Sequence, residues 1–126
     1  TGGTITGLIE ASTDRHTILG FSALKGNFLQ QEVAQRTAKS NWKIIDDYCF
    51  GGYAKTTPEL FQFILTFEDQ HHIPLEQVYT GKMLYGIFDL ISKAYFAENS
   101  RILVIHSGGL QGRKIPSLIL NNENKI

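Results

Sequence analysis

Apolar positions along the chain recur either at helical spacing or in short continuous runs. Helical spacing occurs in four stretches: residues 4–12, 26–39, 58–73 and 80–95. Three short apolar runs predict buried strands: residues 17–21, 42–45 and 101–106. Apolar runs bounded by helices favour parallel strands that are covered on both faces. We therefore expect an α/β fold with a parallel sheet of three or more strands flanked by helices, in which residues 101–106 are buried on both faces.

The clearest helix start in the sequence lies at residue 57. Thr57 is predicted to cap the helix, with Pro58 at its first position, where a missing N–H costs nothing. Thr56 with Glu59 offers an alternative capping box. The two long helices each carry an apolar stripe that predicts the core. The stripes comprise Leu60, Phe61, Ile64, Leu65 and Phe67 in the first helix, and Met83, Leu84, Ile87, Phe88, Ile91 and Tyr95 in the second.

Composition and charge fit a single soluble domain over residues 1–126 and argue against several classes of partner. Hydrophobic residues make up 42% of the chain, and 12 basic side chains balance 12 acidic ones. Nucleic-acid-binding domains carry a clustered basic face, and a membrane-spanning helix needs about 20 apolar residues, so neither partner is expected. The one cysteine, Cys49, excludes an intrachain disulfide and favours a reducing compartment, which is the cytoplasm by default.

The glycine-rich turn Thr1-Gly2-Gly3-Thr4 precedes a predicted helix. Such a turn presents unpaired backbone N–H groups, and the helix dipole adds partial positive charge. The turn is therefore a candidate phosphate cradle, with two hydroxyls as further donors. On the loop sequence alone, an ordinary glycine turn is equally compatible. Because such a loop needs a strand before it, the chain is expected to be the C-terminal portion of a larger enzyme.

Several short motifs follow one another in a fixed order. They are Thr1-Gly2-Gly3-Thr4 with Gly7-Leu8, Asp46-Asp47-Tyr48, Gly52-Tyr53, Val78-Tyr79-Thr80-Gly81-Lys82 and Ile105-His106-Ser107-Gly108-Gly109. As an ordered set they resemble the D-cysteine desulfhydrase / 1-aminocyclopropane-1-carboxylate deaminase family over residues 1–112. The separation of the two motif tyrosines, 79 − 53 = 26 positions, agrees with that family.

The resemblance implies a tryptophan-synthase-β-like fold, of which this chain would be part of the large cofactor domain, and a pyridoxal 5'-phosphate cofactor. It places the cofactor phosphate on Thr1, Gly2, Gly3 and Thr4. It also implies that Tyr79 faces the substrate and cofactor, and that Tyr53 lies across the same cleft. The family acts on small amino acids and usually forms homodimers. The alternative for both tyrosines is that they fill the core with a satisfied hydroxyl.

Two further positions distinguish the branches of the family. Deaminases carry a glutamate after the motif tyrosine, near the pyridine nitrogen, where this chain has Thr80. Deaminases have an apolar residue after the strand histidine, whereas desulfhydrases have a hydroxyl, and this chain has Ser107. The resemblance implies that Thr80 and Ser107 also contact the cofactor. A hydroxyl does not hold a proton on the pyridine as a carboxylate does, so the ring withdraws electrons less strongly. The resemblance therefore favours β-elimination from D-cysteine, with release of sulfide, ammonia and pyruvate; the alternatives are 1-aminocyclopropane-1-carboxylate deamination and a non-catalytic relative that binds a phosphorylated ligand.

Some features depart from the family pattern. Its Schiff-base lysine and its Ser-Asn segment precede the glycine turn, and no lysine here stands at the matching position, so the chain by itself is expected to be inactive. Ala54 follows Tyr53 where the family commonly has glycine. Lys82 is interpreted as a lysine that supports the fold.

The remaining candidate residues receive structural interpretations. His71-His72 are interpreted as a solvated helix end and not as metal ligands, since adjacent histidines cannot share one helix face. Cys49 is interpreted as a small core residue. His106 is expected to pack or to donate a hydrogen bond.

Overall fold

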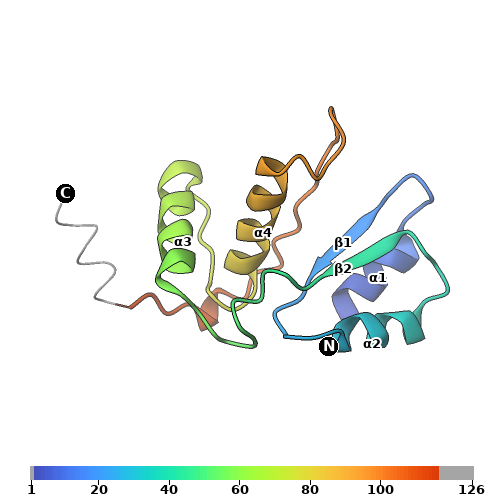
Figure 1. Cartoon of the computed structure of the whole chain (residues 1–126), viewed down its shortest axis with the longest axis horizontal. Coiled ribbons are helices and arrows are strands. Elements are labelled where there is room, and N and C mark those ends of the chain that lie inside the picture. Colours follow the sequence, from blue (N-terminus) through green and yellow to red (C-terminus); the bar gives the residue numbers. More distant parts are fainter. Residues whose placement is uncertain (1, 117–126) are drawn as a thin grey trace.

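The computed structural model describes residues 2–116. The elements are α1 (Gly3–Ala11), β1 (Ile18–Phe21), α2 (Phe28–Arg36), β2 (Trp42–Ile45), α3 (Pro58–His71), α4 (Thr80–Ser92) and a short 3₁₀ helix, η1 (Leu110–Gly112). Figure 1 shows β1 and β2 together with α1 and α2 at one end of the molecule, and α3 beside α4 at the other. The expected α/β class is confirmed.

The two strands pair in parallel, as the sequence predicts, with Ile18 opposite Trp42 and Phe21 opposite Ile45. Successive strand residues point to opposite faces of the sheet. A Cβ on Gly20 would lie 2.3 Å from Ile5 Cδ1 of α1. The ring of Phe21 instead faces α4, because a Cβ on Gly86 would lie 2.7 Å from Phe21 Cε1. Helices therefore cover both faces of the strand pair, and two glycines permit the close contacts.

The helix α3 begins where the sequence predicts. Thr57 is its N-cap and Pro58 its first residue, and the Thr57 hydroxyl accepts a hydrogen bond from Leu60 N at 3.2 Å. The stripe of α3 is buried as expected, and Leu60 and Ile64 are fully buried in a core that they share with Leu84 of α4. After α3 ends, residues 72–79 return along the two helices, so that α3 and α4 run in the same direction (Figure 1).

The prediction of a third buried strand at residues 101–106 is wrong. The segment has no strand structure, and Leu103 is 88% exposed. Within residues 2–116 the sheet has two strands, β1 and β2, which pair only with each other. An apolar run signals that a segment can be buried, but a strand also needs a neighbouring strand edge. In the described residues this segment pairs with neither β1 nor β2.

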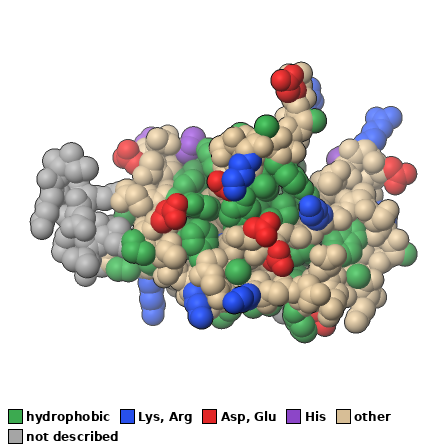
Figure 2. Space-filling view, viewed as in Figure 1, with side chains coloured by type: hydrophobic (Ala, Val, Ile, Leu, Met, Phe, Trp, Pro, Cys, Tyr) green, Lys and Arg blue, Asp and Glu red, His purple; other side chains and the backbone are tan. Residues whose placement is uncertain are grey.

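Several apolar side chains that were expected in the core lie at the surface. On the second stripe, Phe88, Ile91 and Tyr95 are 42%, 50% and 43% exposed. Figure 2 shows hydrophobic side chains gathered over the middle of the molecule, with acidic and basic groups between them. Helical spacing therefore identified the buried half of α4 correctly but extended the core too far. Within residues 2–116, none of the helices has the length and apolarity needed to cross a membrane.

The Thr57 cap can be tested by its contribution to stability. Thr57→Ala should lower the free energy of unfolding by about 1 kcal/mol, because the N–H of Leu60 loses its acceptor. Urea denaturation followed by circular dichroism measures the change. Thr56→Ala is the matched control and should stay within about 0.5 kcal/mol of the parent chain. A larger loss for Thr56→Ala than for Thr57→Ala would contradict the assignment of the cap.

Candidate active site

The structure brings Tyr53 and Tyr79 together. The hydroxyl of Tyr79 donates a hydrogen bond to the hydroxyl of Tyr53 at 3.3 Å. The two ring centroids are 6.2 Å apart, with an interplanar angle of 59°. Tyr53 is 58% exposed and Tyr79 is 56% exposed, so neither fills the core of the described chain. The two phenols that the sequence analysis selected thus form one open hydroxyl pair, and their catalytic roles stay predictions.

The backbone of Tyr79 is held by a buried carboxylate, Glu76, which is 1% exposed. One oxygen of Glu76 accepts hydrogen bonds from Tyr79 N and Thr80 N, both at 2.6 Å. The other oxygen accepts from Val78 N, also at 2.6 Å. Three successive N–H groups converge on one anion at the start of α4, where the helix dipole favours negative charge. The orientation of Tyr79 therefore depends on a rigid turn and not on a mobile loop.

The rest of the motif completes this turn. The Thr80 hydroxyl accepts a hydrogen bond from Glu76 N at 2.9 Å and donates to the Glu76 carboxylate at 3.3 Å. Thr80 is 5% exposed, so its hydroxyl is used inside the turn. A Cβ on Gly81 would lie 2.6 Å from the Glu76 carbonyl oxygen and 2.6 Å from Ile64 Cδ1. Only glycine lets α4 start this close to α3.

The loop that carries Tyr53 has an unusual backbone. Gly51 and Gly52 have φ values of 94° and 134°, and Phe50 and Ala54 have φ values of 55° and 58°. Positive φ is strained for residues with a side chain, which gives a physical reason why glycine would be favoured at position 54. Cys49, which precedes these residues, is buried, in agreement with its interpretation as a core residue.

A buried ammonium joins this loop to α4. Lys82 is 2% exposed, and its Nζ donates to the carbonyl oxygens of Cys49 at 2.8 Å and of Gly52 at 3.1 Å. Burial lowers the pKa of Lys82 below its ordinary value of 10.5. These contacts are consistent with the interpretation of Lys82 as a lysine that supports the fold. The second of them is made to Gly52, the residue directly before Tyr53.

The electrostatic environment favours the neutral form of Tyr79. Its hydrogen bond with Tyr53, followed by burial, raises the pKa of Tyr79 above its ordinary value of 10.0. The phenol is therefore protonated at neutral pH. It can donate a proton directly, but it can accept one only after a nearby positive charge has lowered its pKa.

The glycine turn lies at the N-terminus of α1, and its predicted phosphate binding stays a prediction. Thr1 lies outside the described residues, and Gly3 and Thr4 are exposed. Gly2 is the N-cap of α1 with φ 80°, and no side chain caps this helix. A Cβ on Gly2 would lie 3.0 Å from Leu29 Cδ1 of α2. The turn thus requires glycine at position 2, and it leaves the first N–H groups of α1 without a side-chain cap.

The fifth motif lies in the exposed stretch after residue 100. The ring of His106 accepts a hydrogen bond from Gly108 N at 3.0 Å on Nδ1, so Nε2 carries the proton and donates to the Pro74 carbonyl at 2.9 Å. This agrees with the expected donor role of His106. Ser107 beside it is exposed, and its predicted contact with the cofactor stays a prediction.

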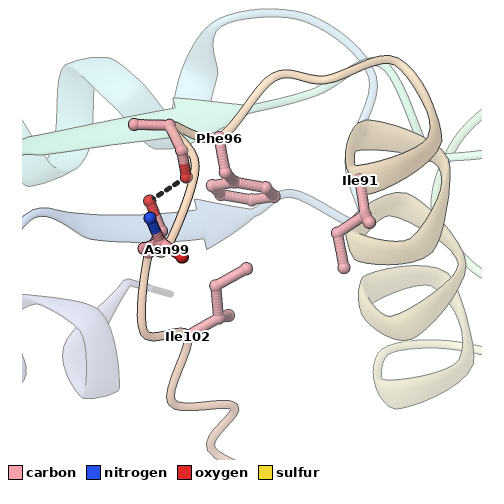
Figure 3. Close-up of a pocket in the computed structure, with 6 residues that line it drawn as sticks. Ile91, Phe96, Asn99 and Ile102 are labelled. Atoms are coloured by element: carbon pink, nitrogen blue, oxygen red, sulfur yellow. Dashed lines mark hydrogen bonds between the residues drawn. The ribbon is translucent and has the colours of Figure 1, made fainter.

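Two cavities in the structure are lined by other residues. One, of about 210 Å³, is lined by Ile91, Phe96, Ala97, Asn99, Ser100 and Ile102. Figure 3 shows Ile91 of α4 facing the segment that carries Phe96 and Ile102. The other, of about 330 Å³, is lined by Asp47, Tyr48, Phe50, Tyr85, Asp89 and Lys93. Neither lining includes Tyr53 or Tyr79, whose side chains are each more than half exposed.

Sequence reasoning missed Glu76, on which the turn before α4 depends. Its position three residues before Tyr79 resembles a capping arrangement, but the segment around it has no helical or strand periodicity. The signal in the sequence is a lone acidic residue shortly before a predicted helix whose second residue is Gly81. That signal does not specify that the carboxylate turns inward to bind three N–H groups.

With the site described, the chain can be compared with known proteins. No protein-family model matches it. Over 66 residues it is 46% identical to a protein of Pyrococcus horikoshii and 42% identical to one of Pyrococcus furiosus, both named "Putative 1-aminocyclopropane-1-carboxylate deaminase". A protein of the same name from Pyrococcus abyssi is 41% identical over 68 residues. The first two matches cover 52% of this chain, and the chain spans about a fifth of the length of these curated relatives, 20% in each case.

A solved structure described as "Crystal Structure Analysis of the ACC deaminase homologue" superposes with a TM-score of 0.78 and 30% sequence identity. The superposition covers 88% of this chain and 38% of the solved chain. Together these comparisons confirm the resemblance inferred from the motifs, over part of the chain, and the mixed α/β fold. The residue roles that were carried over from the family stay predictions.

The role of Glu76 can be tested by neutralising its carboxylate. Glu76→Gln should lower the free energy of unfolding by about 3 kcal/mol, because one accepting oxygen becomes a donor that faces backbone N–H groups. Glu98→Gln, at an exposed position, is the matched control and should change stability by less than about 0.5 kcal/mol. Urea denaturation of both variants measures the difference. A loss below about 1 kcal/mol for Glu76→Gln would show that the turn does not depend on the carboxylate.

Proposed function

We propose that this chain forms part of a pyridoxal-phosphate-dependent enzyme that acts on a small amino acid, and that the reaction is β-elimination from D-cysteine. D-cysteine and water would give sulfide, ammonia and pyruvate. The observation that carries the proposal is the hydroxyl pair of Tyr53 and Tyr79, which meets at 3.3 Å from two segments 26 positions apart. The homodimer and the cytoplasmic location stay predictions.

The glycine turn fits the phosphate of such a cofactor. Gly2 adopts φ 80° where a Cβ would press against Leu29, and α1 has no side-chain cap. Backbone N–H groups at a helix N-terminus bind phosphate oxygens well. We assign phosphate binding to the backbone of Gly2, Gly3 and Thr4, with the Thr4 hydroxyl as a further donor. When bound, the cofactor supplies an electron-withdrawing ring that acidifies the Cα–H bond of an amino acid.

The tyrosine pair would handle protons beside the reacting carbon. Tyr79 Oη donates a hydrogen bond to Tyr53 Oη, so the two phenols form one connected pair of hydroxyls. Because the pKa of Tyr79 is raised, its phenol is protonated at neutral pH. It is therefore suited to deliver a proton to a developing negative charge, such as the departing thiolate sulfur or the substrate Cα.

The choice of D-cysteine rests on Thr80 and Ser107, and it meets one difficulty. The position that would place a carboxylate near the pyridine carries a threonine, which leaves the ring a weaker electron acceptor. The Thr80 hydroxyl, however, is bonded to Glu76 inside the turn, so the argument depends on the missing carboxylate and not on a contact made by the hydroxyl. The names of the Pyrococcus relatives favour the alternative, 1-aminocyclopropane-1-carboxylate deamination.

The two substrates can be separated in the longest natural protein that contains this chain. We expect kcat/KM for sulfide and pyruvate release from D-cysteine to exceed that for 2-oxobutanoate release from 1-aminocyclopropane-1-carboxylate by about tenfold or more. Assays of sulfide and of each oxo acid, with pyridoxal phosphate present, measure both reactions. The reverse preference would establish the deaminase alternative. Absence of both activities, with phosphorylated-ligand binding retained, would favour the non-catalytic relative.

The tyrosine pair can be tested in the same protein. Tyr79→Phe should lower kcat by roughly 10²–10⁴-fold, the range for loss of a general acid–base group, while the absorbance of the bound cofactor stays unchanged. Tyr95→Phe is the matched control, because Tyr95 is a half-exposed tyrosine beyond the end of α4. The control should retain the parent kcat. If Tyr79→Phe retains it too, Tyr79 is not catalytic and Tyr53 becomes the leading candidate.

A further inference from the structure

We propose that Lys82 is a positioning residue for the tyrosine pair: its buried ammonium fixes the loop that carries Tyr53 against α4, so that Tyr53 meets Tyr79. The catalytic meaning of this contact rests on the proposed function. The structural claim does not, because it concerns the two rings in the chain itself.

The contacts of Lys82 are confined to one turn of that loop. Its Nζ donates to the carbonyl oxygens of Cys49 and Gly52, and Gly52 N donates to the same Cys49 oxygen at 3.2 Å. The Gly52 oxygen also accepts from Lys55 N at 3.1 Å. The ammonium therefore binds the same two carbonyl oxygens that accept the backbone hydrogen bonds of the turns within residues 49–55. Tyr53 follows Gly52 directly, so its ring direction depends on this turn.

The burial of Lys82 has no simple explanation in packing. Taking an ammonium out of water costs several kcal/mol unless hydrogen bonds compensate, and an apolar side chain of similar length would fill the same space more cheaply. Within residues 2–116, the ion pairs join Arg36 to Glu32, Lys93 to Asp89 and Arg113 to Glu68, and none includes Lys82. Its hydrogen bonds go to backbone oxygens of an irregular loop. What the charge adds is a fixed loop geometry.

Lys82 lies close to Tyr79 along the helix. Residues three apart lie on one side of a helix, and the first turn of α4 begins directly after Tyr79. Met83 N binds the Tyr79 carbonyl at 3.0 Å, which ties that residue to the turn containing Lys82. Glu76 thus fixes Tyr79 on the helix side, and Lys82 fixes the loop of Tyr53 to the same turn. The two buried charges hold opposite members of the pair.

The test compares ring contacts in the 126-residue chain with labelled tyrosine and phenylalanine. The parent chain should show a nuclear Overhauser effect between the Tyr53 and Tyr79 rings, and another between the Phe63 and Tyr85 rings, whose centroids are 5.3 Å apart across α3 and α4. Lys82→Met keeps the apolar stem and removes the donors. It should lose the Tyr53–Tyr79 effect and retain the Phe63–Tyr85 effect.

Lys43→Met is the matched control, since Lys43 is an exposed lysine on β2 whose Nζ lies 5.6 Å from the Tyr95 ring centroid. It should retain both effects. Lys82→Gln serves as a second variant: its amide is uncharged and one bond shorter, so its nitrogen falls short of the Nζ position from which both carbonyl oxygens are bound, and it should also lose the Tyr53–Tyr79 effect. Retention of that effect in either folded Lys82 variant would overturn the proposal. Loss of the Phe63–Tyr85 effect in both would make Lys82 a general stabiliser of the fold and overturn it equally.

The outcome is independent of whether the enzyme assignment is right. If the ring contact is lost as expected but the larger protein acts on neither substrate, the positioning of Tyr53 stands and the proposed reaction fails. If both substrates are assayed and D-cysteine is consumed while Lys82→Met keeps the ring contact, the reaction stands and the positioning claim fails.

Discussion

Two buried charges at the start of α4 define the geometry on which the site depends. Glu76 and Lys82 are 1% and 2% exposed, and each is satisfied by backbone groups instead of by the other. The carboxylate accepts hydrogen bonds from N–H groups, and the ammonium donates hydrogen bonds to carbonyl oxygens. The backbone groups of two irregular segments, the turn before α4 and the loop before Tyr53, are thereby paired without regular secondary structure. Burying a charge is costly unless its hydrogen bonds are complete, which makes these segments specific in conformation. The motif Val78-Tyr79-Thr80-Gly81-Lys82 is largely a frame for one exposed phenol.

Local signals in the sequence predicted most of the regular structure. The strand at Trp42–Ile45 has the bounds that its apolar run indicates, and the Thr57–Pro58 cap forms as expected. These features depend on neighbours within a few residues, so the pattern contains the information. The pairing of Tyr53 with Tyr79 is different: composition and periodicity do not place them together, and their selection came from the family resemblance.

The errors have one physical origin. Residues 101–106, Phe88 and Ile91 are apolar enough to be buried, but burial needs a second surface, and the described residues cover them only in part. Val104 packs against the core between α3 and α4, whereas Leu103 beside it is 88% exposed. Hydrophobic spacing indicates that a segment is able to be buried, but it does not indicate whether another segment packs over it. Glu76 was missed for the complementary reason. A buried carboxylate has no periodic signature, because its partners are the N–H groups of a turn whose shape the side chain itself creates.

The state of the phenols limits what the pair can do. Tyr79 is more than half exposed, and its hydrogen bond to Tyr53 raises its pKa, so its hydroxyl is neutral at physiological pH. Lys82 is the nearest buried cation along the helix, but its ammonium is engaged with Cys49 and Gly52. None of the contacts described within residues 2–116 brings a positive charge to the Tyr79 hydroxyl, so a charge that lowers its pKa would come from outside them, for example with a ligand. Without one, the pair is a proton donor; with one, it can also accept. The buried side chains of Glu76 and Lys82 thus fix the backbone around the site, while the exposed phenols of Tyr53 and Tyr79 are left to react.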